Sequence, residues 1–135
     1  MTKELWLNLP VKDTQKAKAF FKQIGFTFKD ERETPEMVAM MVGQRPVPVM
    51  LCEEKQFQSF SMNEITDTQK SSEILISFDA ESRSEVDQIA ENVKNAGGNL
   101  FSPPSEIQGW MYGCAFADLD GHRWNVLYMD MSKMK

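Results

Sequence analysis

Histidine, cysteine and long apolar runs are all scarce in this sequence of 135 residues. It holds one histidine, His122, and two cysteines, Cys52 and Cys114, whose spacing matches no zinc motif. No Ser/His/Asp set, Cys/His pair or phosphate-cradling glycine loop is evident, so nucleophilic catalysis and nucleotide binding lack candidate residues. No apolar stretch approaches the roughly 20 residues needed to cross a bilayer, and a membrane is therefore not an expected partner.

Basic charge is also in short supply. The 15 Lys and Arg residues are outnumbered by 20 Asp and Glu residues, which gives a net charge of -5. Without a basic cluster, nucleic acid is not an expected partner, and the acidity serves mainly solubility. The two cysteines lie in apolar, strand-like runs, which is typical of buried, reduced thiols and favours a cytoplasmic protein.

A strand, a helix and a hairpin are predicted in the first half of the chain. Apolar and polar residues alternate over residues 5–11, a period of two that is typical of a strand. Asp13 is a suitable N-cap for a helix with one apolar stripe, which Gly25 ends. A short strand follows at residues 26–28, and two strand-like runs then flank a turn at residues 43–46, which predicts a hairpin.

The second half repeats this order. Residues 73–78 predict a strand, and Ser82 with Glu85 forms a capping box at the start of a helix. Another strand begins near residue 99, and two further runs flank the acidic turn at residues 118–121 as a second hairpin. The matching order indicates a duplicated module, with helices covering one face of largely antiparallel sheets. The predicted fold is α+β with paired βαβββ modules in a single domain of residues 1–135: module one at about residues 4–52, a linker at about 53–72 and module two at about 73–130.

The segments LNLPVKDTQKAKAFFKQIGFTF and FADLDGHRWNVLYMD, within these paired modules, resemble the glyoxalase, bleomycin resistance and extradiol dioxygenase superfamily, also called vicinal oxygen chelate proteins. The resemblance spans nearly the whole chain and is nearest to small bacterial proteins described as predicted lactoylglutathione lyases. It implies a curved sheet around a pocket and, at this chain length, a homodimer. It implies no single reaction, because the superfamily includes lyases, isomerases, dioxygenases and antibiotic-sequestering proteins.

The resemblance also implies up to four metal ligands on the inner face of the sheets. In the family these are usually His, Glu or Gln, which suit Ni, Zn, Mn or Fe. Carried over onto this sequence, the positions hold Trp6, Glu73, Met50 (or its neighbour Leu51) and Asn125. Only Glu73 is a strong ligand among them, and Asn125 has lost the charge of the family's glutamate. We therefore expect no cofactor and no divalent metal of the usual kind.

Six residues are candidates for binding a ligand. Strand alternation puts Asn8 on the same face as Trp6, and Asn125 projects from the last strand among large apolar side chains. Trp6 is either a stacking wall for a planar ligand or a core aromatic residue. Residues 110–112 form either a lid or an ordinary strand start. The candidate ligand-binding residues are Trp6, Asn8, Met50, Trp110, Tyr112 and Asn125.

Glu73 is the candidate catalytic residue. A pocket carboxylate whose pKa is raised by burial can move a proton, whereas a solvated residue at a strand start cannot be tuned in this way. Both interpretations of Glu73 fit the sequence. His122 directly follows the turn at residues 118–121 and is interpreted as structural. The turn itself lacks the glycine and the final acid of a calcium loop.

The sequence thus favours a protein that binds a small organic molecule in a β-sheet pocket without the usual metal. The alternative is a metal-dependent lyase or isomerase like lactoylglutathione lyase, which needs a metal to polarise a carbonyl and a carboxylate to move the proton. Whether the protein is an enzyme is left open. An extradiol dioxygenase needs two histidines and a carboxylate at iron, and the single His122 excludes it.

Overall fold

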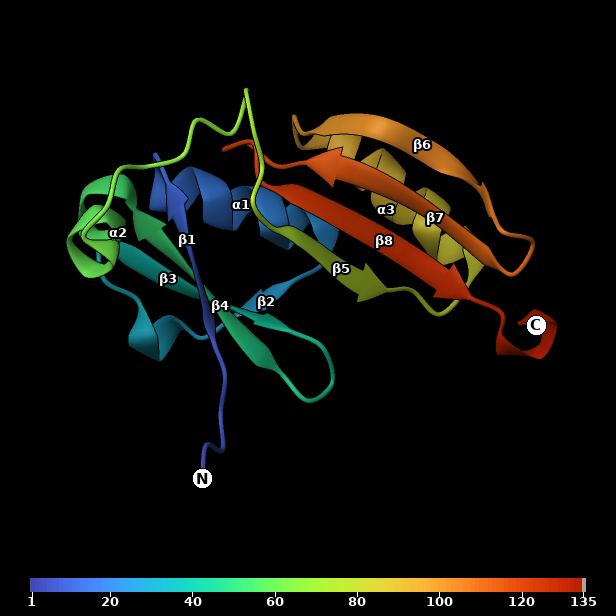
Figure 1. Ribbon diagram of the computed structural model, residues 1–135, viewed down its shortest axis with the longest axis horizontal. Helices are drawn as coiled ribbons and strands as arrows, with labels where there is room; N and C mark the ends of the chain where they lie inside the picture. The colour runs from blue at the N-terminus through green and yellow to red at the C-terminus, as the bar shows by residue number, and fades with distance from the viewer. Residues whose placement is uncertain (135) are drawn as a thin grey trace. The chain divides into compact units, whose positions relative to one another are not determined.

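The computed structural model describes residues 1–134, which form two compact units (Figure 1). The first unit is Met1–Asp67 and the second begins at Thr68, so their boundary falls inside the predicted linker. Each unit contains one four-stranded sheet and one long helix against that sheet. No helix within residues 1–134 is long and apolar enough to span a membrane.

In the first unit, the strands lie in the order β1-β4-β3-β2. The pairing of β1 with β4 is parallel, whereas β3 is antiparallel to both of its neighbours. The elements of this unit are β1 (Leu7–Val11), α1 (Thr14–Ile24), β2 (Thr27–Phe28), the 3-10 helix η1 (Asp30–Arg32), β3 (Met37–Val42), β4 (Val47–Glu53) and α2 (Glu54–Ser61).

The second unit repeats the arrangement, with strand order β5-β8-β7-β6 and helix α3 against one face of the sheet (Figure 1). The pairing of β5 with β8 is parallel and the other two pairings are antiparallel. Its elements are β5 (Leu75–Asp79), α3 (Arg83–Asn95), β6 (Asn99–Ile107), β7 (Met111–Ala117), β8 (Arg123–Met129) and the 3-10 helix η2 (Met131–Lys133). The predicted α+β fold of paired βαβββ modules is confirmed.

The two long helices, α1 and α3, begin at the N-cap residues that the sequence predicts. The Asp13 carboxylate accepts hydrogen bonds from the backbone N–H groups of Gln15 and Lys16, each at 3.0 Å. The Ser82 hydroxyl accepts from the N–H of Glu85 at 3.0 Å. The Glu85 carboxylate reaches the N–H of residue 81 rather than that of the cap residue itself, so the reciprocal half of the capping box is shifted by one position.

Three expected boundaries differ from the structure. Strand β1 begins at Leu7, because continuing its register with β4 would place Trp6 opposite Pro48, which has no N–H to donate. Strand β5 begins at Leu75, whose partner is the first residue of β8, so Glu73 precedes the strand instead of starting it. The predicted linker also contains helix α2.

Each face of the first sheet is buried by different elements. Strand alternation puts Leu9, Val38 and Leu51, all buried, on the face that receives the apolar stripe of α1. The opposite face carries a smaller buried cluster of Ala39, Met50 and Cys52, against which Met37 and the α2 residue Phe57 pack. The α2 helix therefore covers only part of this second face.

The turn between β7 and β8 is organised by one buried carboxylate. Asp118 Oδ1 accepts from the backbone N–H groups of Asp120 and His122 at 2.9 and 3.0 Å, and Oδ2 accepts from Trp124 Nε1 at 3.0 Å. His122 is buried beside it, as the structural interpretation of this histidine expects. Burial raises the pKa of the Asp118 carboxyl above its usual value, because desolvation disfavours the charged form. The Trp124 ring stacks on Phe116, with ring centroids 6.3 Å apart, so the carboxylate also fixes the centre of the core.

We predict that Asp118→Ala lowers the free energy of unfolding by about 2–4 kcal/mol, because it leaves the buried Trp124 indole N–H and two backbone N–H groups without an acceptor. Urea denaturation followed by circular dichroism measures the change. Glu31→Ala, at an exposed position of η1, is the control and should shift stability by no more than about 0.5 kcal/mol. Equal effects of the two substitutions would contradict this role for Asp118.

Candidate functional site

A groove of about 980 Å³ lies in the first unit, on the sheet face opposite α1. Its size matches that of pockets for small organic ligands, roughly 300–1,000 Å³. It is lined by the segment before β1, by β1, β3 and β4, by the β3–β4 turn, by the segment that follows β2, and by Phe60 of α2. The lining residues are Lys3, Glu4, Leu5, Trp6, Asn8, Lys29, Arg32, Met37, Met41, Arg45, Pro46, Val47, Pro48, Met50 and Phe60.

The base of the groove is apolar and adaptable. Met37, Met41 and Met50, here called the methionine floor, project from β3 and β4 on one face of the sheet. Methionine side chains are unbranched and polarisable, so they can adjust to ligands of different shape. Trp6 and Phe60 add aromatic rings that are 55% and 60% exposed, and exposed rings at a groove are available to stack on a planar ligand.

One polar side chain projects from the strands into this apolar surface. Asn8 lies opposite Met50 in the parallel register of β1 and β4. The Cys52 sulfur lies 3.7 Å from Asn8 Oδ1 and 3.7 Å from the Met50 carbonyl oxygen, and its single proton can be donated to either acceptor. Within residues 1–134, the Asn8 Nδ2 group donates no hydrogen bond, so it remains available to an acceptor on a ligand.

Four basic side chains surround the apolar base. They are Lys3, Lys29, Arg32 and Arg45, here called the cationic rim, and they come from the N-terminal segment, the residue that follows β2, η1 and the β3–β4 turn. Glu4 is the single acidic residue of the lining. The groove therefore carries an excess of positive charge in a chain whose net charge is -5.

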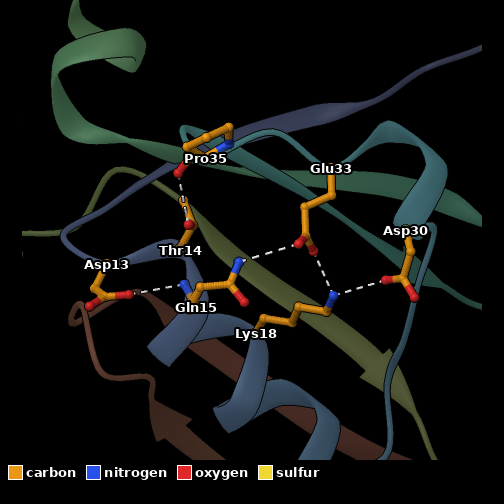
Figure 2. A network of polar contacts seen from close by, with 7 residues as sticks. All are labelled: Asp13, Thr14, Gln15, Lys18, Asp30, Glu33 and Pro35. Carbon is orange, nitrogen blue, oxygen red and sulfur yellow. Dashed lines mark hydrogen bonds and ion pairs between the residues drawn. The ribbon is translucent and has the colours of Figure 1, made fainter.

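Helix α1 holds the segment that supplies part of this rim, as Figure 2 shows. Lys18 Nζ donates to Asp30 Oδ1 at 2.8 Å and to Glu33 Oε1 at 2.5 Å. The Thr14 hydroxyl donates to the carbonyl of Pro35 at 3.1 Å. The hydrogen bond from Lys18 holds the pKa of Asp30 below its usual value, and both acids hold the pKa of Lys18 above its own. Residues 30–35 are thereby fixed to α1.

The corresponding sheet face of the second unit carries different side chains. Ser77 and Asn125 are register partners in β5 and β8, and Asn125 Nδ2 donates to the Ser77 hydroxyl at 3.3 Å. Asn8 precedes the N-cap Asp13 by five residues, and Ser77 precedes the N-cap Ser82 by five. The pairs Asn8–Met50 and Ser77–Asn125 are thus equivalent in the two modules.

The structure places the other predicted site residues apart from these pairs. The Tyr112 hydroxyl donates to Asp87 of α3 at 2.6 Å, and the Arg83 guanidinium lies 5.0 Å from its ring, so Tyr112 faces the helix. The hydrogen bond to Asp87 raises the pKa of Tyr112. Trp110 lies in the β6–β7 turn and is half-buried. Tyr112 does not share a sheet face with Asn125, because alternation in β7 and β8 separates odd from even positions.

Glu73 is exposed and precedes β5 by two positions. Counted from the N-caps, the counterpart of Trp6 is Leu75 and not Glu73, because two residues separate the end of β5 from the cap Ser82. The assignment of Glu73 to the ligand position of the first strand was therefore wrong in register. A proton-transfer role for this residue stays a prediction.

The residues at the family's ligand positions do not fit a divalent metal ion. Trp6 and Met50 offer an indole and a thioether, neither of which is a ligand for Ni, Zn, Mn or Fe in an oxygen and nitrogen site. Asn125 offers a neutral amide already engaged with Ser77. Among residues 1–134, no three His, Cys, Asp or Glu side chains gather closely enough to hold a metal ion.

Three of the groove residues, Trp6, Asn8 and Met50, were predicted from the sequence, and the others were not. Alternation along residues 37–42 would have placed Met37 and Met41 on the same face as Met50, so a signal for these two existed. The cationic rim gave no such signal, because its residues come from irregular segments that have no side-chain period.

Comparisons with known proteins indicate the family to which this chain is related. The sequence profile of the Glyoxalase/Bleomycin resistance protein/Dioxygenase superfamily matches residues 5–126. Comparison with the sequences of curated proteins gives no match.

Several solved structures are similar. A hypothetical protein from S. aureus is 37% identical, with a TM-score of 0.84 and 94% of each chain covered. A glyoxalase/bleomycin resistance protein/dioxygenase family enzyme from Burkholderia phytofirmans is 17% identical, with a TM-score of 0.77 over 90% of this chain and 94% of that one. A genomically encoded fosfomycin resistance protein from Listeria monocytogenes is 21% identical, with a TM-score of 0.67 over 94% and 93%. The last two likenesses show the fold alone.

We predict that the chelator-stripped protein binds Ni²⁺, Zn²⁺, Mn²⁺ and Fe²⁺ no more tightly than about 100 µM, because the donors described above include no cluster of charged oxygen or imidazole ligands. Isothermal titration calorimetry measures the affinity. Micromolar or tighter binding that Glu73→Gln abolishes would overturn this prediction.

The two cysteines are free and buried, as the sequence predicted. Burial raises the pKa of Cys52 and of Cys114 to about 11. At pH 8 such a thiol is roughly 0.1% thiolate, whereas an ordinary thiol is about 25% thiolate. We predict that the native protein reacts with Ellman's reagent on the order of 100-fold more slowly than the guanidinium-unfolded protein, which releases two equivalents per chain. Rapid release of one equivalent from the native protein would show that one thiol is accessible.

Proposed function

This chain belongs to the Glyoxalase/Bleomycin resistance protein/Dioxygenase superfamily, and on that premise we propose that it binds a small organic molecule in the groove of its first unit. Membership alone selects no reaction, because one fold hosts many functions. The observation that carries the proposal is the groove itself, whose apolar base and spare amide suit a ligand with an apolar body. Binding uses no divalent metal.

Three features of the groove make different contributions to ligand binding. The methionine floor adapts to the apolar body of the ligand, and Trp6 stacks on any planar part of it. Asn8 Nδ2 donates a hydrogen bond to a ligand acceptor and so fixes its orientation. The Asn8 carbonyl oxygen faces the Cys52 thiol, and the amide N–H groups of the same side chain are left for the ligand.

The resemblance to lyases of this superfamily supports a catalysed reaction less well than the groove supports ligand binding. Isomerisation of a glutathione adduct requires a metal to polarise its carbonyl and a base to move its proton. At the positions where the resemblance places metal ligands, this chain has Trp6 and Met50. A sequestering or sensing role therefore agrees better with the residues present.

The probe for this proposal is N-phenyl-1-naphthylamine, a neutral aromatic molecule that fluoresces in apolar surroundings. We expect saturable binding to the wild-type protein and a ligand-dependent rise in melting temperature. Trp6→Ala should weaken binding by about fivefold to tenfold, because it removes an aromatic contact worth about 1–1.5 kcal/mol. Fluorescence titration measures the dissociation constant.

Phe101→Ala is the matched control, since Phe101 is an exposed aromatic residue, 41% accessible, in the second unit. This substitution should leave the dissociation constant within about twofold of wild type, because it lies outside the groove. Absence of saturable binding by the wild-type protein would refute the proposal. So would glutathione-dependent turnover of methylglyoxal in the presence of Ni²⁺ or Zn²⁺.

A further inference from the structure

The four residues of the cationic rim line the groove and take part in none of the ion pairs of the described structure. The ion pairs within residues 1–134 involve Lys18, Arg83, Lys94 and Lys133. None of them involves Lys3, Lys29, Arg32 or Arg45. The rim therefore keeps its full positive charge at the mouth of the groove, in a chain that has five more acidic than basic residues.

The reason lies in the neighbours of Lys29 and Arg32. Three acids adjoin them in sequence: Glu31 is exposed between the two cations, and Asp30 and Glu33 lie directly beside Lys29 and Arg32. The last two are engaged elsewhere. Both carboxylates instead accept hydrogen bonds from Lys18 of α1, whose side chain is only 13% exposed (Figure 2). Gln15 Nε2 makes a further contact to Glu33 at 3.5 Å. The contacts with helix α1 thus engage two of the three neighbouring acids, and Lys29 and Arg32 are left without an ion pair in the described structure.

We propose that the ligand of the groove is a small organic anion, with its apolar body on the methionine floor and its acidic group held by Lys29 and Arg32. The inference rests on the function proposed above and narrows the class of ligand. Arginine and lysine together bind a carboxylate, phosphate or sulfonate by charge-assisted hydrogen bonds. An apolar base beside unpaired cations is more complementary to an amphiphilic anion than to a neutral or cationic molecule of the same shape.

The test compares two probes that share one aromatic body. 1-Anilinonaphthalene-8-sulfonate carries a sulfonate, and N-phenyl-1-naphthylamine is the same molecule without it. In Lys29→Gln/Arg32→Gln, we expect the dissociation constant of the sulfonate to rise about tenfold and that of the neutral probe to change less than about twofold. Raising the salt concentration should weaken the sulfonate selectively, because both cations are accessible to solvent.

Lys16→Gln/Lys70→Gln is the matched control, because it removes the same charge from exposed positions outside the groove. The affinity of the sulfonate should then stay within about twofold of wild type. An equal loss in the control would mean that net charge, and not the rim, attracts the anion, which would overturn the inference.

Lys18 is a positioning residue in this scheme, since it does not line the groove. Lys18→Met releases Asp30 and Glu33, which then compete for Lys29 and Arg32. We expect weaker sulfonate binding with little change for the neutral probe, and retention of both affinities in Lys18→Arg. A purely structural role would weaken both probes alike.

The outcomes separate the two proposals. Binding of the neutral probe with a sulfonate affinity that the rim substitutions leave unchanged would refute the anionic ligand and keep the groove as a binding site. Failure of both probes to bind the wild-type protein would refute the groove as a binding site.

Discussion

Each helix of this protein covers only one face of its four-stranded sheet, and this constraint decides where every strand side chain goes. In the first unit the face under α1 takes Leu9, Val38 and Leu51, so the intervening residues must project from the opposite face. In the second unit the contact of Tyr112 with Asp87 of α3 fixes which positions of β7 and β8 face the helix. Because the side-chain period of a strand is two, a shift of one residue would exchange the two faces, and the buried helix contacts prevent that shift.

The two modules use equivalent positions for different chemistry. Asn8 with Met50, and Ser77 with Asn125, occupy the same place in the register of their sheets. In the first unit the pair joins a methionine floor and carries a spare amide donor. In the second unit the amide is engaged with a hydroxyl. A duplicated fold has thus kept its strand pairing while the residues on the face opposite the long helix diverged, and none of the four residues is a strong metal ligand.

The groove is positively charged because of the local distribution of charged residues, although the net charge of the chain is negative. The chain is acidic, yet four cations line one groove with a single acid. Lys18 accounts for part of this, because it satisfies Asp30 and Glu33 on the helix side. The ion pairs of Lys18 engage Asp30 and Glu33, and the nearby cations of the rim therefore remain without these two acids as partners.

The sequence by itself determined the element order, the two helix caps and the acidic hairpin turn, because these depend on neighbouring residues: Asp13 and Ser82 reach N–H groups in the next turn, and Asp118 reaches the backbone of its own turn. It also placed Asn8 on the face of Trp6 through the period of the strand, whereas Met50 became a candidate only through the resemblance to the superfamily. The register of Glu73 was misjudged, since counting from the end of a strand misses the two residues before the cap. Tyr112 was assigned to a pocket, although its partner lies in a helix distant in sequence. Only the tertiary structure brought Lys29, Arg32 and Arg45 to one groove, because irregular segments carry no period from which the direction of a side chain can be inferred.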